Sequence, residues 1–153
     1  KLVNTLSIPV MLVSGSLLAN LKTSYTQLGN VFKLLDQNLI LPTDEMILAK
    51  ETKNFLKEKS LELKIVLTSN IIACITRAVQ EKLGAAFLPI AYVQSELNSG
   101  RLQAFGPREG FWQHHLYLYT FKGNTSPYIL GLSTILNDFS VLKFDSEVYG
   151  TSV

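Results

Sequence analysis

Short apolar runs and longer amphipathic segments alternate along the chain. The short runs are rich in β-branched residues or leucine and predict buried strands. They are residues 8–13, 39–41, 63–67 and 85–88. Between them, apolar residues recur at helical spacing and predict helices at about residues 43–59 and 71–83. The pattern therefore predicts an α/β protein that contains a β-α-β-α-β unit.

The central part of this unit, residues 61–93, is a strand, a helix and a second strand. In one sheet this order implies neighbouring parallel strands joined by a right-handed crossover. Helices on both faces should then bury the strand residues Ile65, Leu67, Ala86 and Leu88. Gly84 should end the helix in the left-handed conformation.

The remaining segments are assigned from their turn residues and periodicity. Residues 17–38 predict a surface connection, 90–98 a short helix, 101–105 a short strand, 115–121 a core strand, 127–140 a helix, and 143–153 an extended tail.

Composition narrows the range of functions. The chain has 153 residues, 47% of them hydrophobic, which is enough for one substantial core. A net charge of +2 gives no support for nucleic-acid binding by this segment. A single cysteine excludes an intrachain disulfide, and Cys74 is predicted to be an inert core thiol. No apolar run approaches the length of about 20 residues that spans a bilayer, so no membrane contact is expected.

Motifs for catalysis, cofactors or metals are not found. His114 and His115 are adjacent and would point to opposite faces of a strand, so they are interpreted as strand-edge polar residues. Asp44 and Glu45 are interpreted as first-turn residues that favour the helix dipole, with an acid–base pair as the weaker alternative. The sequence thus predicts a non-enzymatic protein without a cofactor or metal ion.

Polar residues gather where the predicted parallel strands end. These residues are Pro42, Thr43, Thr68, Ser69, Asn70 and Pro89. In open α/β sheets the carboxyl ends of the strands line the ligand site, and free helix N–H groups there attract anions. The same Thr, Ser and Asn residues also cap helices, which needs no ligand. The residues alone do not decide between a ligand site and helix capping.

A pattern of structural residues along the second half of the chain resembles the effector-binding domain of LysR-type transcriptional regulators. It consists of Val79, Gly84, Ala86, Phe87, Leu88, Pro89, Val93, Leu97, Gly100, Arg101 and Leu102. The resemblance covers about residues 8–140. It departs from the family at Lys82, where the family usually has a second glycine. The segments LILPTDEM and NFL resemble the branch that activates sodium/proton antiporters.

The resemblance implies a two-lobed fold like that of periplasmic binding proteins of type 2. Residues 1–142 would form a partial effector-binding domain. Within it, residues 8–122 match the second lobe with its crossover strands, and residues 126–140 match the helix that returns to the first lobe. The family's first-lobe units and DNA-binding helix-turn-helix are not among these residues, so we expect an N-terminally truncated chain.

The function that the resemblance implies is effector sensing in the cleft between the lobes, which modulates DNA binding and transcription activation by the full-length protein. It favours the binding-site reading of Pro42, Thr43, Thr68, Ser69, Asn70 and Pro89. The implied partners are a small-molecule or ionic effector and further copies of the chain, with DNA contacted only through the absent helix-turn-helix. A cytoplasmic location follows. The alternative is a solute-binding receptor of a transporter with the same fold.

Overall fold

The structure is a computed structural model that describes residues 2–15, 38–123 and 126–140. Almost all of the predicted connection at residues 17–38, and the whole predicted tail at 143–153, lie outside these residues. The elements, in chain order, are β1 (Leu2–Gly15), β2 (Asn38–Pro42), α2 (Ile47–Glu58), β3 (Lys64–Ser69), α3 (Ile72–Gln80), β4 (Ala86–Pro89), η2 (Ile90–Val93), α4 (Gln94–Asn98), β5 (Leu102–Phe105), β6 (Trp112–Tyr119) and α5 (Pro127–Ser140).

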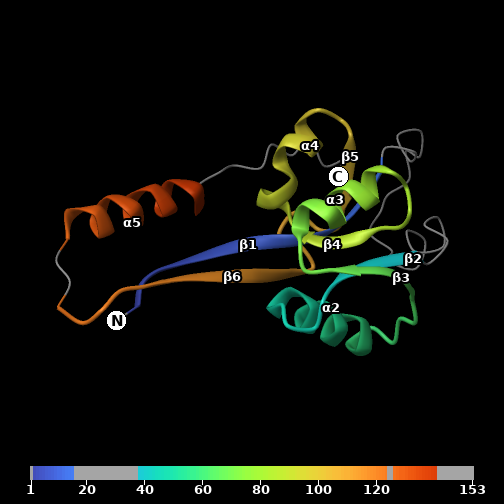
Figure 1. Cartoon of the computed structure of the whole chain (residues 1–153), viewed down its shortest axis with the longest axis horizontal. Coiled ribbons are helices and arrows are strands. Elements are labelled where there is room, and N and C mark those ends of the chain that lie inside the picture. Colours follow the sequence, from blue (N-terminus) through green and yellow to red (C-terminus); the bar gives the residue numbers. More distant parts are fainter. Residues whose placement is uncertain (1, 16–37, 124–125, 141–153) are drawn as a thin grey trace.

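Strand β1 organises the sheet. Its C-terminal half lies between β4 and β5, and its N-terminal part pairs with β6. All three pairings are antiparallel. The predicted strand at residues 8–13 is therefore part of a longer strand, which projects from the other strands together with β6 in Figure 1.

Strand β2 lies between β3 and β4. It pairs in parallel with β3 along its whole length. On its other side Ile40 N–H donates to the Ala85 carbonyl at 2.8 Å, and Ala85 N–H donates to the Asn38 carbonyl at 3.1 Å. The strands thus form two sheets, one of β4, β1 and β5 with β6 paired to β1, and one of β2 and β3, and the Leu39–Ala85 bridge joins them. The predicted strand–helix–strand unit is present, but its two strands are separated by β2 and are not neighbours.

The burial predicted for these two strands is half right. Ala86 and Leu88 of β4 are fully buried, as predicted. Ile65 and Leu67 of β3 are 49% and 37% exposed, so that part of the prediction is wrong. Strand β3 pairs only with β2 in the two-stranded sheet, whereas β4 pairs with β1 and is bridged to β2 through Ala85.

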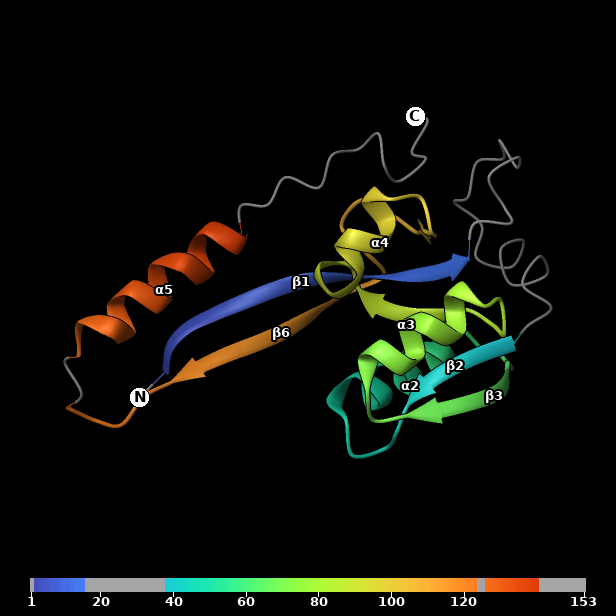
Figure 2. The same ribbon diagram turned by 45° about the horizontal axis from the view of Figure 1, so that its top comes forward.

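Helices cover both faces of the sheet. In Figure 1, α2 lies below the strands and α3 and α4 lie above them, and Figure 2 shows the same layers after a turn. Helix α2 buries Phe55 and α3 buries Ile75 and Val79. Cys74 lies outside this inward stripe and is exposed, so its predicted place in the core is wrong.

The turn after α3 uses different residues from those predicted. Lys82 adopts the left-handed conformation with a φ of 63°, and Gly84 does not. A Cβ on Gly84 would lie 2.9 Å from the carbonyl oxygen of Asn38. Gly84 is therefore needed because the backbone entering β4 approaches β2 closely. Lys82 occupies a strained position that glycine would occupy without cost.

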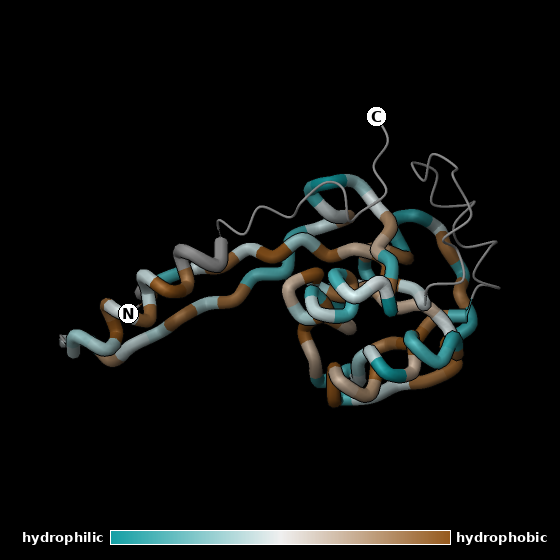
Figure 3. Tube along the Cα trace, turned by 90° about the horizontal axis from the view of Figure 1, so that it is seen from above, coloured by the Kyte–Doolittle hydropathy of each residue, from teal (hydrophilic) through white to brown (hydrophobic). Residues whose placement is uncertain are grey.

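A second region, which we call the arm, projects from this compact body. It consists of residues 2–6 of β1, residues 115–119 of β6, and α5, all at the left of Figure 1. Asn4 Nδ2 donates to the Ser133 carbonyl of α5 at 3.0 Å. Apolar positions recur along the arm in Figure 3, yet many are exposed. Tyr117, Tyr119 and Phe121, predicted to be core residues, are among the exposed ones.

Candidate functional site

The ends of β2 and β3 bring most of the predicted site residues together. In the parallel register Leu41 lies opposite Thr68 and Pro42 opposite Ser69. Thr43 N–H then donates to the Ser69 carbonyl at 3.1 Å. Asn70 follows directly. Strand β4, which ends at Pro89, points to the same edge in Figure 2. We call this group of six residues the strand-end site.

Thr43 does not cap helix α2, contrary to the sequence prediction. The helix begins at Ile47, and its N-cap residue Met46 makes no side-chain cap. The Thr43 carbonyl instead accepts from Met46 N–H at 2.9 Å in a turn before the helix. Asp44 and Glu45 lie in this turn and not in the first helical turn. The predicted capping and dipole roles of this segment are therefore wrong.

Thr43 places a hydroxyl at this edge. Its Oγ1 atom is buried. It lies near enough to the exposed Glu45 carboxyl to lower the pKa of that group.

Ser69 plays a local structural part. Its Oγ accepts from Ile71 N–H at 3.1 Å, one residue before helix α3 begins. Thr68 and Asn70 are exposed. In the first turn of α3, Cys74 N–H donates to the Ile71 carbonyl at 3.0 Å. Ser69 therefore closes the turn before α3 and does not cap the helix, so the prediction that it is a cap is wrong.

Charges beside Thr43 are mixed. Asp44 forms an exposed ion pair with Lys53 of α2. The lowered pKa of Glu45 keeps that carboxyl ionised at neutral pH. An anionic ligand would be attracted by the helix N–H groups and repelled by Glu45. The edge is thus chemically able to hold a small polar ligand with both hydrogen-bond acceptors and cationic or hydroxyl groups.

A polar cluster away from this edge was missed by the sequence analysis. Glu51 Oε2 accepts from Trp112 Nε1 at 3.2 Å and lies 2.8 Å from His114 Nδ1. His114 is buried, so its interpretation as a strand-edge residue is wrong, whereas His115 is exposed. The signal was available, because His114 shares its face of β6 with Leu116 and Leu118. Nothing in the sequence indicated Glu51 as the partner.

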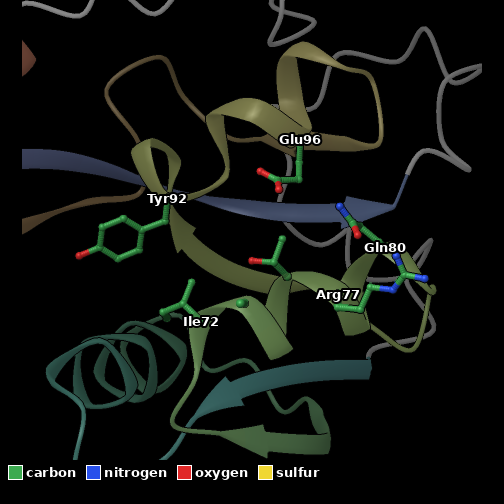
Figure 4. A pocket seen from close by; sticks show the side chains of 7 residues that line it. Ile72, Arg77, Gln80, Tyr92 and Glu96 are labelled. Carbon is green, nitrogen blue, oxygen red and sulfur yellow. The ribbon is translucent and has the colours of Figure 1, made fainter.

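A hollow lies between α3 and the η2–α4 segment, with a volume of about 310 Å³. Figure 4 shows the side chains that line it, among them Ile72, Arg77, Gln80, Tyr92 and Glu96. Burial, and then the Glu51 carboxylate, raise the pKa of Tyr92. None of the strand-end residues lines this hollow.

Metal and membrane features are not found in the part of the chain that the structure describes. No three His, Cys, Asp or Glu residues are grouped there as a metal site would require. No helix within the described ranges is long and apolar enough to cross a bilayer.

Residues 26–138 match the family described as LysR substrate binding domain. No curated protein sequence matches the chain. Among solved structures, the regulatory domain of CcmR from Synechocystis PCC6803 in complex with 2-PG is similar with a TM-score of 0.68 at 16% identity, over 92% of this chain and 68% of that one.

Two further structures have the same fold. The effector-binding domain of QuiR in complex with shikimate gives a TM-score of 0.62 at 18% identity, over 92% of this chain and 63% of that one. The apo regulatory domain of HypT from Salmonella typhimurium gives 0.64 at 15% identity over 90% of this chain. This chain spans 65% of the HypT domain.

Proposed function

Because this chain belongs to the LysR substrate binding domain family, we propose that it senses a small-molecule or ionic effector and passes the signal to a transcriptional regulator. Its α/β fold is the periplasmic-binding-protein type 2 fold, as predicted, and the family is regulatory and not enzymatic. Effector binding would favour one arrangement of the lobes and so change DNA binding and transcription activation by the full-length protein. Such a regulator would act in the cytoplasm.

The lobe assignment follows from the same family. Residues 8–122 would form the second lobe with its two crossover strands, and residues 126–140 the helix that returns to the first lobe. Two observations support this division. Strands β1 and β6 run side by side out of the body, and α5 lies at their far end without a sheet of its own. A first lobe would cover the apolar positions of the arm.

The strand-end site, Pro42, Thr43, Thr68, Ser69, Asn70 and Pro89, is our candidate for the effector contacts of this lobe. The meeting of Thr43 and Ser69 at the ends of two parallel strands, where Thr43 N–H donates to the Ser69 carbonyl at 3.1 Å, is the observation that supports it most. Structures with the same fold hold small polar or ionic ligands: 2-PG in CcmR, shikimate in QuiR and a bromide ion in HypT. The edge-to-edge contact of β2 and β3 keeps Thr43 and Ser69 together.

The residues LILPTDEM and NFL further favour the branch that activates sodium/proton antiporters. Sodium is accordingly the first ionic effector to test. We also propose that the chain forms homo-oligomers, because the exposed apolar residues of the arm invite a partner chain. Light scattering at micromolar concentration checks this, and a monodisperse monomer would contradict it.

The effector site is tested in the full-length regulator with Thr43→Ala and Ser69→Ala. If these hydroxyls contact the effector, each variant weakens effector binding by about 1–3 kcal/mol, or about 5- to 150-fold. The matched control is Ser95→Ala, an exposed serine on α4. Titration of transcriptional induction measures the effect. Variants that lose stability but respond to effector as the wild type does would show that these residues only shape the turns.

A further inference from the structure

The Glu51 carboxylate joins two elements that are far apart in the chain. It projects from helix α2 and meets two N–H groups of strand β6, Trp112 Nε1 at 3.2 Å and His114 Nδ1 at 2.8 Å. The His114 side chain is 9% exposed and that of Glu51 25% exposed. A partly desolvated carboxylate that accepts two hydrogen bonds holds its partners more firmly than an exposed ion pair would.

Packing leaves the β6 side of this contact little freedom. The Trp112 ring lies 5.0 Å from the Phe55 ring and 5.3 Å from the Phe87 ring, measured between centroids. The Tyr92 ring meets the His114 ring edge-on at 6.3 Å. Because interiors are closely packed, the two N–H donors are held in place and Glu51 must meet them there.

On the α2 side, backbone hydrogen bonds connect this contact to the strand-end site. The Thr43 carbonyl accepts from Met46 N–H at 2.9 Å, and the Met46 carbonyl accepts from Ala49 N–H at 3.1 Å. Helix α2 begins at Ile47, so Glu51 lies just over one turn into it. These two hydrogen bonds connect Thr43 to the helix that carries Glu51.

On the β6 side, the strand itself connects this contact to the arm. His114 pairs with Ile8 and Trp112 with Val10, and from there β6 continues along β1 to the arm and α5. Glu51 of α2 makes hydrogen bonds to β6 where this strand leaves the body (Figure 1).

We propose that Glu51 is a positioning residue that couples the strand-end site to strand β6 and hence to the arm. This inference rests on the proposed function, because it assigns the route by which an effector at Thr43 would move the strand that leads to the other lobe. The hydrogen bonds tolerate only small changes in distance. A shift of α2 must then either move β6 with it or break the contact.

Trp112 provides the test, because it is the single tryptophan of the chain and its indole N–H is one of the two donors. The chain is labelled with ¹⁵N and the indole N–H resonance is followed by NMR. Thr43→Val replaces the hydroxyl by a methyl group of the same shape. We expect it to move the Trp112 resonance, whereas Thr134→Val on α5 should leave it unchanged.

The Glu51 variants then identify the route. In the Glu51→Ala background Thr43→Val should no longer move the Trp112 resonance. Glu51→Gln keeps an acceptor oxygen and should retain part of the response. The matched control is Glu58→Gln, which removes a charge from the exposed last turn of the same helix and should retain all of it. His114→Gln provides a second break if Glu51→Ala does not fold.

Two results would overturn the inference. One is a Trp112 resonance that does not respond to Thr43→Val in the otherwise wild-type chain. The other is a response that persists unchanged in the Glu51→Ala and Glu51→Gln backgrounds, because the route would then bypass Glu51. The proposed function fails by a different measurement, namely normal induction of the Thr43→Ala and Ser69→Ala regulators, so the two failures are distinguishable.

Discussion

The body and the arm of this molecule are built from similar residues but differ in burial. In the body, Val10, Leu12 and Leu88 are fully buried between helices on both faces of the sheet. In the arm, Tyr119, Tyr128 and Leu130 are more than half exposed, although they lie on a regular strand and a regular helix. Local pattern therefore determined the elements in both regions. Burial was determined by whether a second layer is available.

The comparison is tested most strongly by leucine truncation in each region. Leu12→Ala, in the C-terminal half of β1, should destabilise the body by about 2–5 kcal/mol, because it leaves a cavity that the sheet cannot close. Leu132→Ala, on the exposed side of α5, should change the free energy of unfolding by no more than about 0.5 kcal/mol. Urea denaturation measures both. A large loss for Leu132→Ala would mean that a partner chain covers α5.

Glycine-to-alanine substitutions in the two regions are expected to change the free energy of unfolding in opposite directions. A Cβ at Gly84 would lie 2.9 Å from the Asn38 carbonyl oxygen, so Gly84→Ala should cost about 1–3 kcal/mol. At Gly131, in α5, a Cβ would meet nothing within 4 Å among the described residues. Gly131→Ala should stabilise that helix by up to about 1 kcal/mol.

The two glycine variants are compared by urea denaturation and by the helical circular dichroism signal. If Gly131→Ala destabilised the protein instead, the surface of α5 would have to contact another segment or chain closely. If Gly84→Ala were neutral, the approach of β2 to the chain entering β4 would be looser than the structure indicates.

Sequence predicted the elements of the body well because prolines and apolar runs are local signals. It predicted β4 as buried and β3 as equally buried, and only the first prediction is right. The placement of β2 between β3 and β4 is a property of the whole fold, which a run of apolar residues does not encode. The exposure of Tyr117 and Tyr119 was not predicted either, because a local pattern does not show whether a second layer covers the strand.

The candidate site was predicted only in outline. Parallel strand ends meet at one sheet edge by geometry, so the approach of Thr43 to Ser69 followed from the pattern of elements. That helix α2 starts at Ile47, which leaves the Thr43 hydroxyl without a capping role, did not follow, because Thr43 is itself a good cap residue. The contact of Glu51 with Trp112 and His114 joins residues more than 60 positions apart and has no local signal.

Left-handed residues without glycine mark strain in the body. Among the described residues, the two non-glycine positions with positive φ are Ser60 and Lys82. Lys82→Gly should stabilise the protein by about 1 kcal/mol, because a left-handed side chain costs roughly 1–2 kcal/mol and glycine gives back part of this in the unfolded chain. Ser60→Gly, with a φ of 51°, is the matched comparison. Destabilisation by Lys82→Gly in urea would show that the lysine stem stabilises the turn.

The smallest expected effect concerns tyrosine ionisation. Burial, and then the Glu51 carboxylate, raise the pKa of Tyr92 in the body. The folded state therefore keeps the phenol proton to higher pH than the unfolded chain, whose tyrosines ionise near pH 10, at about the usual value. Above that pH the unfolded state binds fewer protons, so stability falls as pH rises towards the folded-state pKa.

Tyr92→Phe should remove this alkaline loss. Its melting temperature should fall less than that of the wild type between about pH 8 and about pH 10.5, a window that brackets the ordinary tyrosine pKa. Tyr119→Phe, on the exposed part of the arm, is the matched control and should decline as the wild type does. Equal declines for Tyr92→Phe and the wild type would mean that Tyr92 is as well solvated as the arm tyrosines. In that case Glu51 and the Tyr92–His114 ring pair would be more exposed to solvent, and their contacts would restrain β6 less.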